Sequence, residues 1–298
     1  MGVRRGSACY REVGAELVAR RQAAGLTGQQ IADISGWTRT KVARMEKGET
    51  STSVTDLIHY LVQCKITIPQ MRPILDLARV AERRLGYWLS DHRIGNTLGT
   101  LIYHESAAYR SISYEPLVVP GLLQTTGYMS ARIGADQDMS HDEVAAAIRT
   151  RVERQRILRW ETRDRFTFFV HEQALRLCVG SPAVMHEQLL HLVLMSALDQ
   201  VTLRVIPSAA GGRGIIGGPF SLLEPAKYEA LVYLDTRSGG LFLEGTHHVK
   251  AYQRVLPELN AHSVSEGESR SFVANLADEC DRGCQPDAAE HLEEEQLQ

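Results

Sequence analysis

The sequence predicts an α+β fold, in which an all-α domain at the N-terminus precedes a mixed α+β domain with a mostly antiparallel sheet. Two observations lead to this division. Apolar residues recur at helical spacing over the first 85 residues, whereas short apolar runs typical of strands begin only near residue 165. The chain has 298 residues, of which 44% are hydrophobic, so it is long enough to form two globular domains.

We expect four parts along the chain: a helix-turn-helix domain at 9–85, a connector at 86–102, an α+β domain at 103–280 and an acidic tail at 281–298. The connector is assigned because its apolar residues follow neither helical nor strand spacing. Residues 278–298 contain eight acidic side chains and one arginine, and the composition of residues 283–298 predicts disorder.

The N-terminal domain is expected to contain five helices, at 9–24, 28–34, 38–48, 53–62 and 70–85. Gly25 ends the first helix, and the hydroxyl of Thr27 caps the second. Gly36 supplies the tight turn that follows, and Thr38 caps the third helix. The second and third helices therefore form a helix-turn-helix, in a compact all-α domain.

The C-terminal domain is expected to combine helices with short strands. Its helices are predicted at 103–113, 126–133, 141–160, 182–198, 247–260 and 266–279. Its strands are predicted at 165–171, 201–206, 220–224, 231–235 and 240–243. The later strands follow one another at hairpin spacing, which favours antiparallel pairing.

Charge is distributed unevenly along the chain. The net charge of −3 gives the whole protein no nucleic-acid signature, but residues 1–50 contain nine Lys or Arg against five Asp or Glu. Such a basic segment indicates a local contact with phosphate. The five cysteines are odd in number and irregularly spaced, which disfavours a disulfide framework and favours a reducing cytoplasm. We also expect no signal peptide and no membrane span, because no run approaches the ~20 apolar residues that a span requires.

The third helix has two chemically different faces. Val42 and Met45 are placed toward the core. The opposite face carries the residues expected to contact DNA bases, which are Arg39, Thr40 and Arg44. An arginine there can bind guanine O6 and N7 through a bidentate pair worth ~1–3 kcal/mol of discrimination. The residues expected to contact phosphate are Gln29, Lys41 and Lys47. The alternative is a small helical domain whose charges are only solvated.

The same segment follows a recurring pattern, G-L-T-x-x-x-I-A…G-x-[ST]-x-[ST]-x-V-x-x-x-E-x-G. Its matches are Gly25-Leu26-Thr27, Ile31-Ala32, Gly36, Thr38, Thr40, Val42, Glu46 and Gly48. With this pattern, residues 14–62 resemble the phage-repressor-type helix-turn-helix family (the Xre/Cro superfamily, with a lambda-repressor-like fold). The resemblance implies a structural salt bridge between Arg21 and Glu46. Family members usually carry a phosphate-binding Gln after the Thr, and this chain departs from the pattern there with Gly28.

The rest of the chain carries a second set of motifs: YEPLVVPGLLQT at 114–125, RxxRQ at 151–155, VHEQALR at 170–176, VIP at 205–207 and GPFSLLE at 218–224. In these motifs it resembles the C-terminal domain, of unknown function, found in actinobacterial helix-turn-helix regulators. The resemblance implies transcription regulation. It also implies a C-terminal domain that senses a small molecule or binds a small partner protein.

A candidate ligand pocket is assigned to three polar residues beside predicted strands: His171, Glu172 and Glu224. For Glu172 the alternative is a cap on the following helix. The run at 212–217 fits G-x-G-x-x-G, but the strand predicted after it disfavours a nucleotide site, which needs a helix there. The Arg-rich helix at 141–160 is either solvated, a dimer surface or a second phosphate contact.

Taken together, these features predict a cytoplasmic, sequence-specific DNA-binding transcription regulator. A homodimer is expected because one helix-turn-helix reads only a short half-site. No nucleophile and base stand at a recognisable spacing, so we predict no enzymatic activity, and we expect no metal or cofactor. Two alternatives remain: an antitoxin-like or adaptor protein that neutralises a small partner, and an enzyme domain fused to a DNA-binding head.

Overall fold

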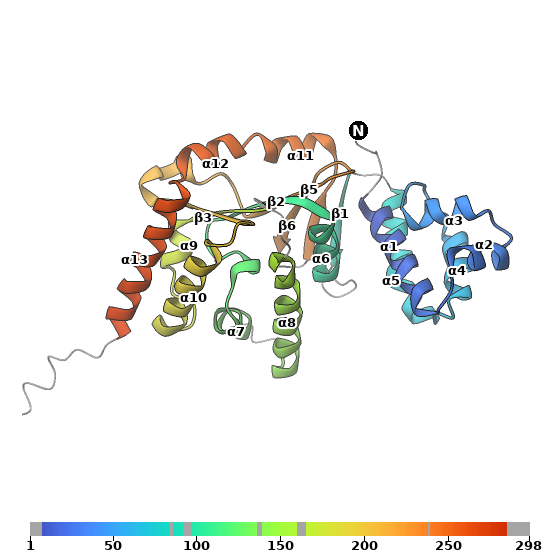
Figure 1. The fold of residues 1–298 in the computed structure, drawn as a ribbon, viewed down its shortest axis with the longest axis horizontal. Coiled ribbons are helices and arrows are strands. Elements are labelled where there is room, and N and C mark those ends of the chain that lie inside the picture. The colour runs from blue at the N-terminus through green and yellow to red at the C-terminus, as the bar shows by residue number, and fades with distance from the viewer. Residues whose placement is uncertain are drawn as a thin grey trace, which may run out of the picture. The chain divides into compact units, whose positions relative to one another are not determined.

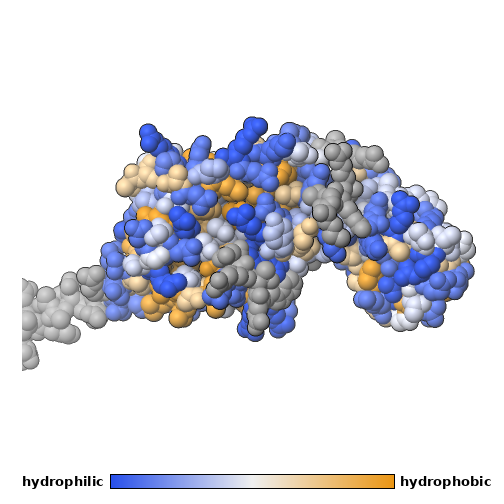
Figure 2. Space-filling model, turned by 45° about the horizontal axis from the view of Figure 1, so that its top comes forward, coloured by the Kyte–Doolittle hydropathy of each residue, from blue (hydrophilic) through white to orange (hydrophobic). Residues whose placement is uncertain are grey.

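The computed structural model of the chain describes residues 8–83, 86–91, 97–135, 139–159, 165–237 and 239–284. It begins with five helices: α1 (Ala8–Ala23), α2 (Gly28–Ser35), α3 (Arg39–Glu46), α4 (Val54–Gln63) and α5 (Ile68–Glu82). All five were predicted from the sequence, with ends that differ by at most three residues. Figure 1 shows them gathered into one bundle, coloured blue to cyan. On the face drawn in Figure 2, mainly hydrophilic residues cover this bundle.

One hydrophobic core joins the five helices. Each helix contributes fully buried or nearly buried side chains, among them Leu17, Ile31, Val42, Leu57 and Ile74. This burial explains why short helices such as α2 and α3 persist, because isolated helices of eight residues are unstable in water.

The remaining described helices are α6 (Thr97–Ala107), α7 (Thr126–Gly134), α8 (His141–Arg154), α9 (Glu172–Arg176), α10 (Pro182–Met195), α11 (Thr246–Gln253), α12 (Leu256–His262) and α13 (Glu266–Cys284). Short 3-10 helices lie at η1 (Gly121–Leu123), η2 (Gln155–Arg159) and η3 (Ser208–Gly214). The strands are β1 (Tyr87–Asp91), β2 (Ala108–Glu115), β3 (Phe166–His171), β4 (Val201–Ile206), β5 (Phe220–Pro225), β6 (Leu231–Thr236) and β7 (Gly239–Leu243). These elements confirm the predicted α+β class.

The strands form one seven-stranded sheet in the order β1-β7-β6-β5-β2-β3-β4. It is mixed: β7 pairs antiparallel with β1 and with β6, whereas β3 pairs parallel with β2 and with β4. The parallel pairs follow from the connections, because helices lie between β2 and β3 and again between β3 and β4. The antiparallel β6 and β7 are joined by a short turn, as the hairpin spacing predicted.

By compactness the chain divides into two units. The first comprises residues 1–109 and 222–253, and the second residues 110–221 and 254–298. The helical bundle therefore shares a unit with β1, β6, β7, α6 and α11. The second unit has its own core, in which β3 and β4 pack with α10 and α13 through residues such as Phe168, Val205, Leu189 and Val273.

Four secondary-structure predictions are wrong in detail. The predicted connector contains β1, and the helix predicted at 103–113 gives way to β2 at Ala108. Both strands are short and are stabilised by pairing with strands distant in sequence, β7 and β3, which local spacing does not reveal. The predicted helix at 141–160 ends at Arg154 and continues as η2. The helix predicted at 247–260 is two helices, because Pro257 lacks the N–H that a continuous helix needs.

At the C-terminus α13 continues to Cys284, so the first four residues of the predicted tail are helical. The rest of that tail lies outside the described residues. Among the described helices, none combines the length and the apolar content that crossing a bilayer requires.

Candidate nucleic-acid interface

The turn between α2 and α3 is built by local backbone signals. The Thr27 side chain accepts a hydrogen bond from the Gln30 N–H, and the Gln30 side chain accepts one from the Thr27 N–H, which completes a capping box at the start of α2. Gly36 ends α2 in the left-handed conformation (φ 67°), which glycine adopts without strain. Thr38 then caps α3 by accepting from the Lys41 N–H. These caps fix where the second helix of the motif begins.

Helix α3 buries one face and exposes the other. Val42 and Met45 are buried in the core of the bundle. The outer face exposes Arg39, Thr40, Arg44 and Lys47. The three side chains expected to contact bases therefore all lie on the solvent side of a single helix, as a major-groove helix requires.

Behind α3, Arg21 of α1 and Glu46 form a bidentate ion pair. The Arg21 Nε donates to Glu46 Oε1 at 2.8 Å, and Nη2 donates to Oε2 at 3.3 Å. The remaining Arg21 nitrogen, Nη1, donates to the Leu26 carbonyl at 2.8 Å, and the Tyr60 hydroxyl donates to Glu46 Oε1 at 2.7 Å. The Arg21 side chain is 13% exposed and that of Glu46 is 9% exposed. These largely buried hydrogen bonds therefore link α1, α3 and α4.

These contacts shift the pKa values of both donors. The hydrogen bond to Glu46 raises the pKa of Arg21 above its ordinary value. Burial, together with the hydrogen bond to Glu46, raises the pKa of Tyr60. Arg21 therefore remains charged and Tyr60 remains a neutral donor at physiological pH.

Arg39 lies over the first residue of α2. A Cβ added to Gly28 would fall 2.7 Å from the Arg39 Cζ and 2.8 Å from its Nη1, so the guanidinium occupies the space that a side chain at position 28 would need. Helix N-termini attract anions through their free N–H groups. Because Gly28 has no side chain, the Arg39 guanidinium can lie at this helix N-terminus.

The three residues expected to contact phosphate differ in their surroundings. Gln29 is exposed, and its Nε2 donates to Asp33 Oδ1 at 2.7 Å. The Lys41 ammonium lies 3.0 Å from Asp56 Oδ1 and 4.1 Å from the centre of the Trp37 ring. Lys47 is exposed at the C-cap of α3. The geometry therefore leaves Lys47 available to a phosphate, while Lys41 is engaged within the bundle.

The bundle is joined to the rest of its unit through α1, which sequence reasoning did not predict. The Thr100 hydroxyl donates to Glu12 Oε1 at 2.6 Å, and the Tyr103 hydroxyl donates to the Arg11 carbonyl at 2.9 Å. Residues Ala8, Cys9 and Tyr10 are buried in one cluster with aromatic residues of β1, β6 and β7. The first turns of α1 are thus part of a second hydrophobic core.

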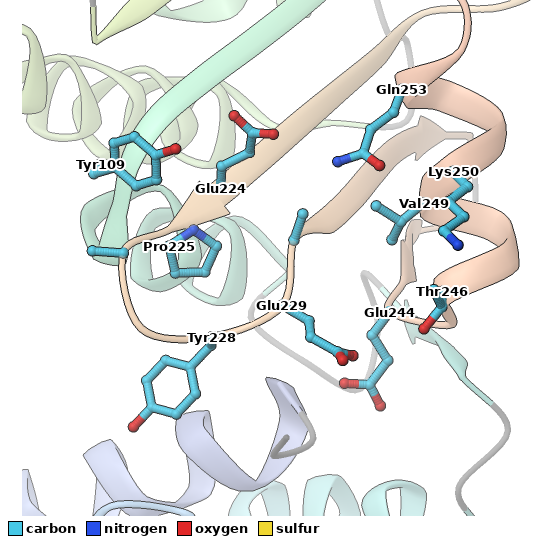
Figure 3. A pocket seen from close by; sticks show the side chains of 12 residues that line it. Tyr109, Glu224, Pro225, Tyr228, Glu229, Glu244, Thr246, Val249, Lys250 and Gln253 are labelled. Carbon is cyan, nitrogen blue, oxygen red and sulfur yellow. The ribbon is translucent and has the colours of Figure 1, made fainter. Parts of the chain in front are cut away.

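Of the three residues assigned to the candidate ligand pocket, Glu224 lines a cavity, and His171 and Glu172 lie at the start of a helix. His171 and Glu172 lie at the start of α9, where the His171 Nδ1 accepts from the Gln173 N–H. Glu172 accepts from the Ser208 N–H at 2.8 Å and from Arg176 Nε at 2.6 Å, which are structural contacts at a helix start. Glu224, in contrast, lines a cavity of about 400 Å³ in the other unit (Figure 3). Two further carboxylates of that cavity, Glu229 and Glu244, carry no local signal in the sequence.

Comparison with known families gives two matches. Residues 12–68 match a helix-turn-helix domain, and residues 98–275 match a domain of unknown function, DUF5753. No curated protein and no solved structure matches the chain. The first match covers most of α1 and all of α2, α3 and α4, which contain the capped turn and the exposed face of α3.

Proposed function

Because the chain belongs to the DUF5753 family and carries a helix-turn-helix domain in front of that domain, we propose that it is a sequence-specific DNA-binding transcription regulator. The helix-turn-helix domain is a DNA-binding and non-enzymatic module, whereas the DUF5753 domain is uncharacterised. The observation that carries the proposal is the outer face of α3, where Arg39, Thr40 and Arg44 are exposed on a helix anchored by its opposite face.

Several finer features belong to the same proposal. The domain is of the Xre/Cro, phage-repressor type, as the buried pair of Arg21 and Glu46 supports. The protein acts in the cytoplasm as a homodimer, because a single eight-residue recognition helix reads too short a half-site for strong discrimination. The DUF5753 domain binds a small ligand or a partner protein that changes the affinity for DNA. Arg39, Thr40 and Arg44 contact bases, while Gln29, Lys41 and Lys47 contact phosphate, with Lys41 exchanging Asp56 for a DNA phosphate.

Replacing Arg39 by alanine is expected to relax base preference at one position of each half-site, by a factor of about 5–150, because a bidentate arginine–guanine pair is lost. Lys47→Ala should instead weaken binding to all sequences and reduce the salt slope by about one. Selection of bound genomic fragments followed by fluorescence anisotropy at several salt concentrations measures both effects. If Arg39→Ala lowers affinity uniformly and reduces the salt slope, Arg39 contacts phosphate at the α2 N-terminus and not a base. Unchanged binding by both variants would remove α3 from the interface.

Gly28→Ala is expected to weaken DNA binding without loss of folding. The new Cβ would displace the flexible end of Arg39, while alanine suits a helix better than glycine by up to ~1 kcal/mol. We expect an unchanged or higher melting temperature together with a lower affinity for the selected fragment. Gly134→Ala is a matched control, because it also replaces a helical glycine and a Cβ there meets nothing within 4 Å. An affinity equal to that of the wild type would show that the position of Arg39 over Gly28 is unimportant for binding.

A further inference from the structure

A histidine in the unit that contains the DNA-binding bundle is closed off from solvent between α6 and the sheet. His104 of α6 is 3% exposed. Three aromatic rings surround it: the centre of the Tyr103 ring lies 4.9 Å away, and those of Trp88 in β1 and Phe242 in β7 both lie 5.9 Å away. Burial raises the pKa of Tyr103 to about 12, so all three rings are uncharged near neutral pH.

Glu12 of α1 faces this histidine. Its Oε2 lies 3.6 Å from the His104 Nε2, and its Oε1 accepts a hydrogen bond from the Thr100 hydroxyl at 2.6 Å. A separation of 3.6 Å is too long for a hydrogen bond. Among the residues that the structure describes, Glu12 Oε2 and His104 Nε2 are both buried atoms without a hydrogen-bond partner. The α1–α6 junction, formed by Glu12, Thr100 and His104, therefore holds an acid and a base side by side where polar atoms are usually paired.

The surroundings of His104 favour its neutral form. Burial lowers the pKa of His104 below its ordinary value of 6.5, although the carboxylate of Glu12 acts in the opposite direction. Two further charged groups act on this pKa: the Arg11 guanidinium lowers it, and the Glu244 carboxylate raises it. Because the net shift is downward, an imidazolium is less stable in the closed junction than in water.

This shift makes the packing of the α1–α6 junction depend on pH. A histidine whose pKa is lower in the closed junction than in water stabilises the closed junction fully above its ordinary pKa of 6.5. The stabilisation is lost as the pH falls from 6.5 toward the lowered value, because the open junction binds the proton more tightly. Acid therefore favours an arrangement in which α1 and α6 have separated at Glu12 and His104.

We infer that the α1–α6 junction is a proton-sensitive switch: protonation of His104 releases the first turns of α1 from α6 and the sheet, and this release lowers the affinity for DNA. The second part rests on the proposed function, because it requires that the bundle binds DNA. The first part concerns the protein alone.

The turns of α1 that would be released also support the end of α3. A Cβ on Gly48, which follows α3, would fall 2.5 Å from the Arg11 backbone nitrogen, and a Cβ on Gly14 would fall 2.9 Å from the Met45 carbonyl oxygen. Arg11 and Gly14 are in the same turn of α1 as Glu12. At such close packing, a displacement of this turn moves the end of α3 or removes its support.

Hydrogen exchange of the full chain without DNA tests the first part. Peptides from the first turns of α1 and from α6 are compared at about pH 7.5 and about pH 5.5, with each rate divided by the intrinsic exchange rate at that pH. We expect the wild type to lose protection about three- to tenfold on acidification, because opening is favoured by up to about tenfold for each pH unit below the ordinary pKa. His104→Phe keeps a ring but binds no proton, so it should lose less than about twofold. His247→Gln removes an exposed imidazole of the same unit and is the matched control, which should respond as the wild type does.

Glu12→Gln distinguishes the histidine from its acidic neighbour. The amide oxygen can still accept from Thr100, but the carboxylate that favours the imidazolium is gone. The pKa of His104 in the closed junction should fall further, so the loss of protection should equal or exceed that of the wild type. Constant protection in the wild type, equal losses in wild type and His104→Phe, or a smaller loss in Glu12→Gln would each overturn the switch. If His104→Phe does not fold at about pH 7.5, Glu12→Gln decides alone.

The second arm measures the affinity of the same proteins for the selected DNA fragment at the two pH values and at constant salt, because phosphate contacts depend on salt. Between about pH 7.5 and about pH 5.5, we expect the wild type to lose affinity about threefold or more relative to His104→Phe. Equal changes of affinity in these two proteins, with opening seen in hydrogen exchange, would overturn the regulatory role and leave the proposed function intact. A protein that never binds DNA would overturn the proposed function, while the exchange experiment would still decide whether the junction opens.

Discussion

Replacing Glu46 by alanine is expected to destabilise the helix-turn-helix domain by about 3–5 kcal/mol, because it leaves a buried arginine without its counter-ion. The Arg21 side chain is 13% exposed and would keep only the Leu26 carbonyl as a partner among the contacts described above. The Tyr60 hydroxyl would lose its acceptor as well. Glu46→Gln should cost less, because an amide oxygen can still accept from Arg21 and Tyr60.

The loss is best measured by hydrogen exchange of peptides from α1–α5 in the full chain, since a protein of two units need not unfold in one step. Each 1.4 kcal/mol corresponds to about a tenfold loss of protection in the slowest amides. Glu16→Ala is the control: it breaks a pair with Arg20 in which both side chains are about 40% exposed, and it should cost at most about 0.5 kcal/mol. Similar losses for Glu46→Ala and Glu16→Ala would mean that the buried pair contributes little.

Gly48→Ala is expected to be the other most damaging single change, with a loss of roughly 2–5 kcal/mol. Gly48 has a φ of 62°, which alanine adopts only with strain. In addition, an added Cβ would fall 2.5 Å from the backbone nitrogen of Arg11, and backbone atoms cannot move aside as a side-chain end can. The chain that leaves α3 would have to separate from α1.

Gly25→Ala separates the conformational strain of a positive φ from the steric overlap of the added Cβ with α1. Gly25 has a nearly equal φ of 70°, but a Cβ there meets nothing within 4 Å. Its replacement should therefore show only the conformational strain, about 1–2 kcal/mol. If both variants lose the same protection in hydrogen exchange and the same melting temperature, the close approach of Gly48 to α1 adds nothing.

Both damaging changes lie where α1 meets the end of α3, the helix proposed to contact DNA bases. Glu46 is the last residue of α3 and Gly48 follows shortly after it, and their partners Arg21 and Arg11 are on α1. The position of α3 therefore depends on how α1 is held, and α1 is held in part by Glu244, the residue that follows β7.

The sequence predicted the DNA-binding bundle well for a physical reason. Its signals are local: Thr27 and Thr38 cap helices through residues three positions away, and Gly36 turns the chain through its own φ. The outward placement of Arg39 and Arg44 follows from helical periodicity, with Val42 and Met45 as the buried reference. Such features are encoded by residues within a few positions of one another, so they can be recognised without the tertiary structure.

The long-range features were decided only by the tertiary structure. Strand β1 exists because it pairs with β7, with Tyr87 opposite Leu243 and Asp91 opposite Gly239. No local pattern links two segments so far apart in the sequence. The contact between Glu244 and the start of α1 joins residues 236 positions apart, and with it the cavity beside the bundle. Only Glu224 of its three carboxylates was noticed in the sequence, since a carboxylate in a loop or at a strand end looks the same whether it is solvated or lines a cavity.

By itself, then, the sequence determined the helix-turn-helix, its caps and the residues that α3 exposes, because these depend on neighbours within a few positions. The folded chain decided that Arg39 rests over Gly28, that α1 belongs to two cores and that three distant glutamates surround one space. These facts depend on which surfaces meet, and packing of distant segments selects among arrangements that the local sequence permits equally.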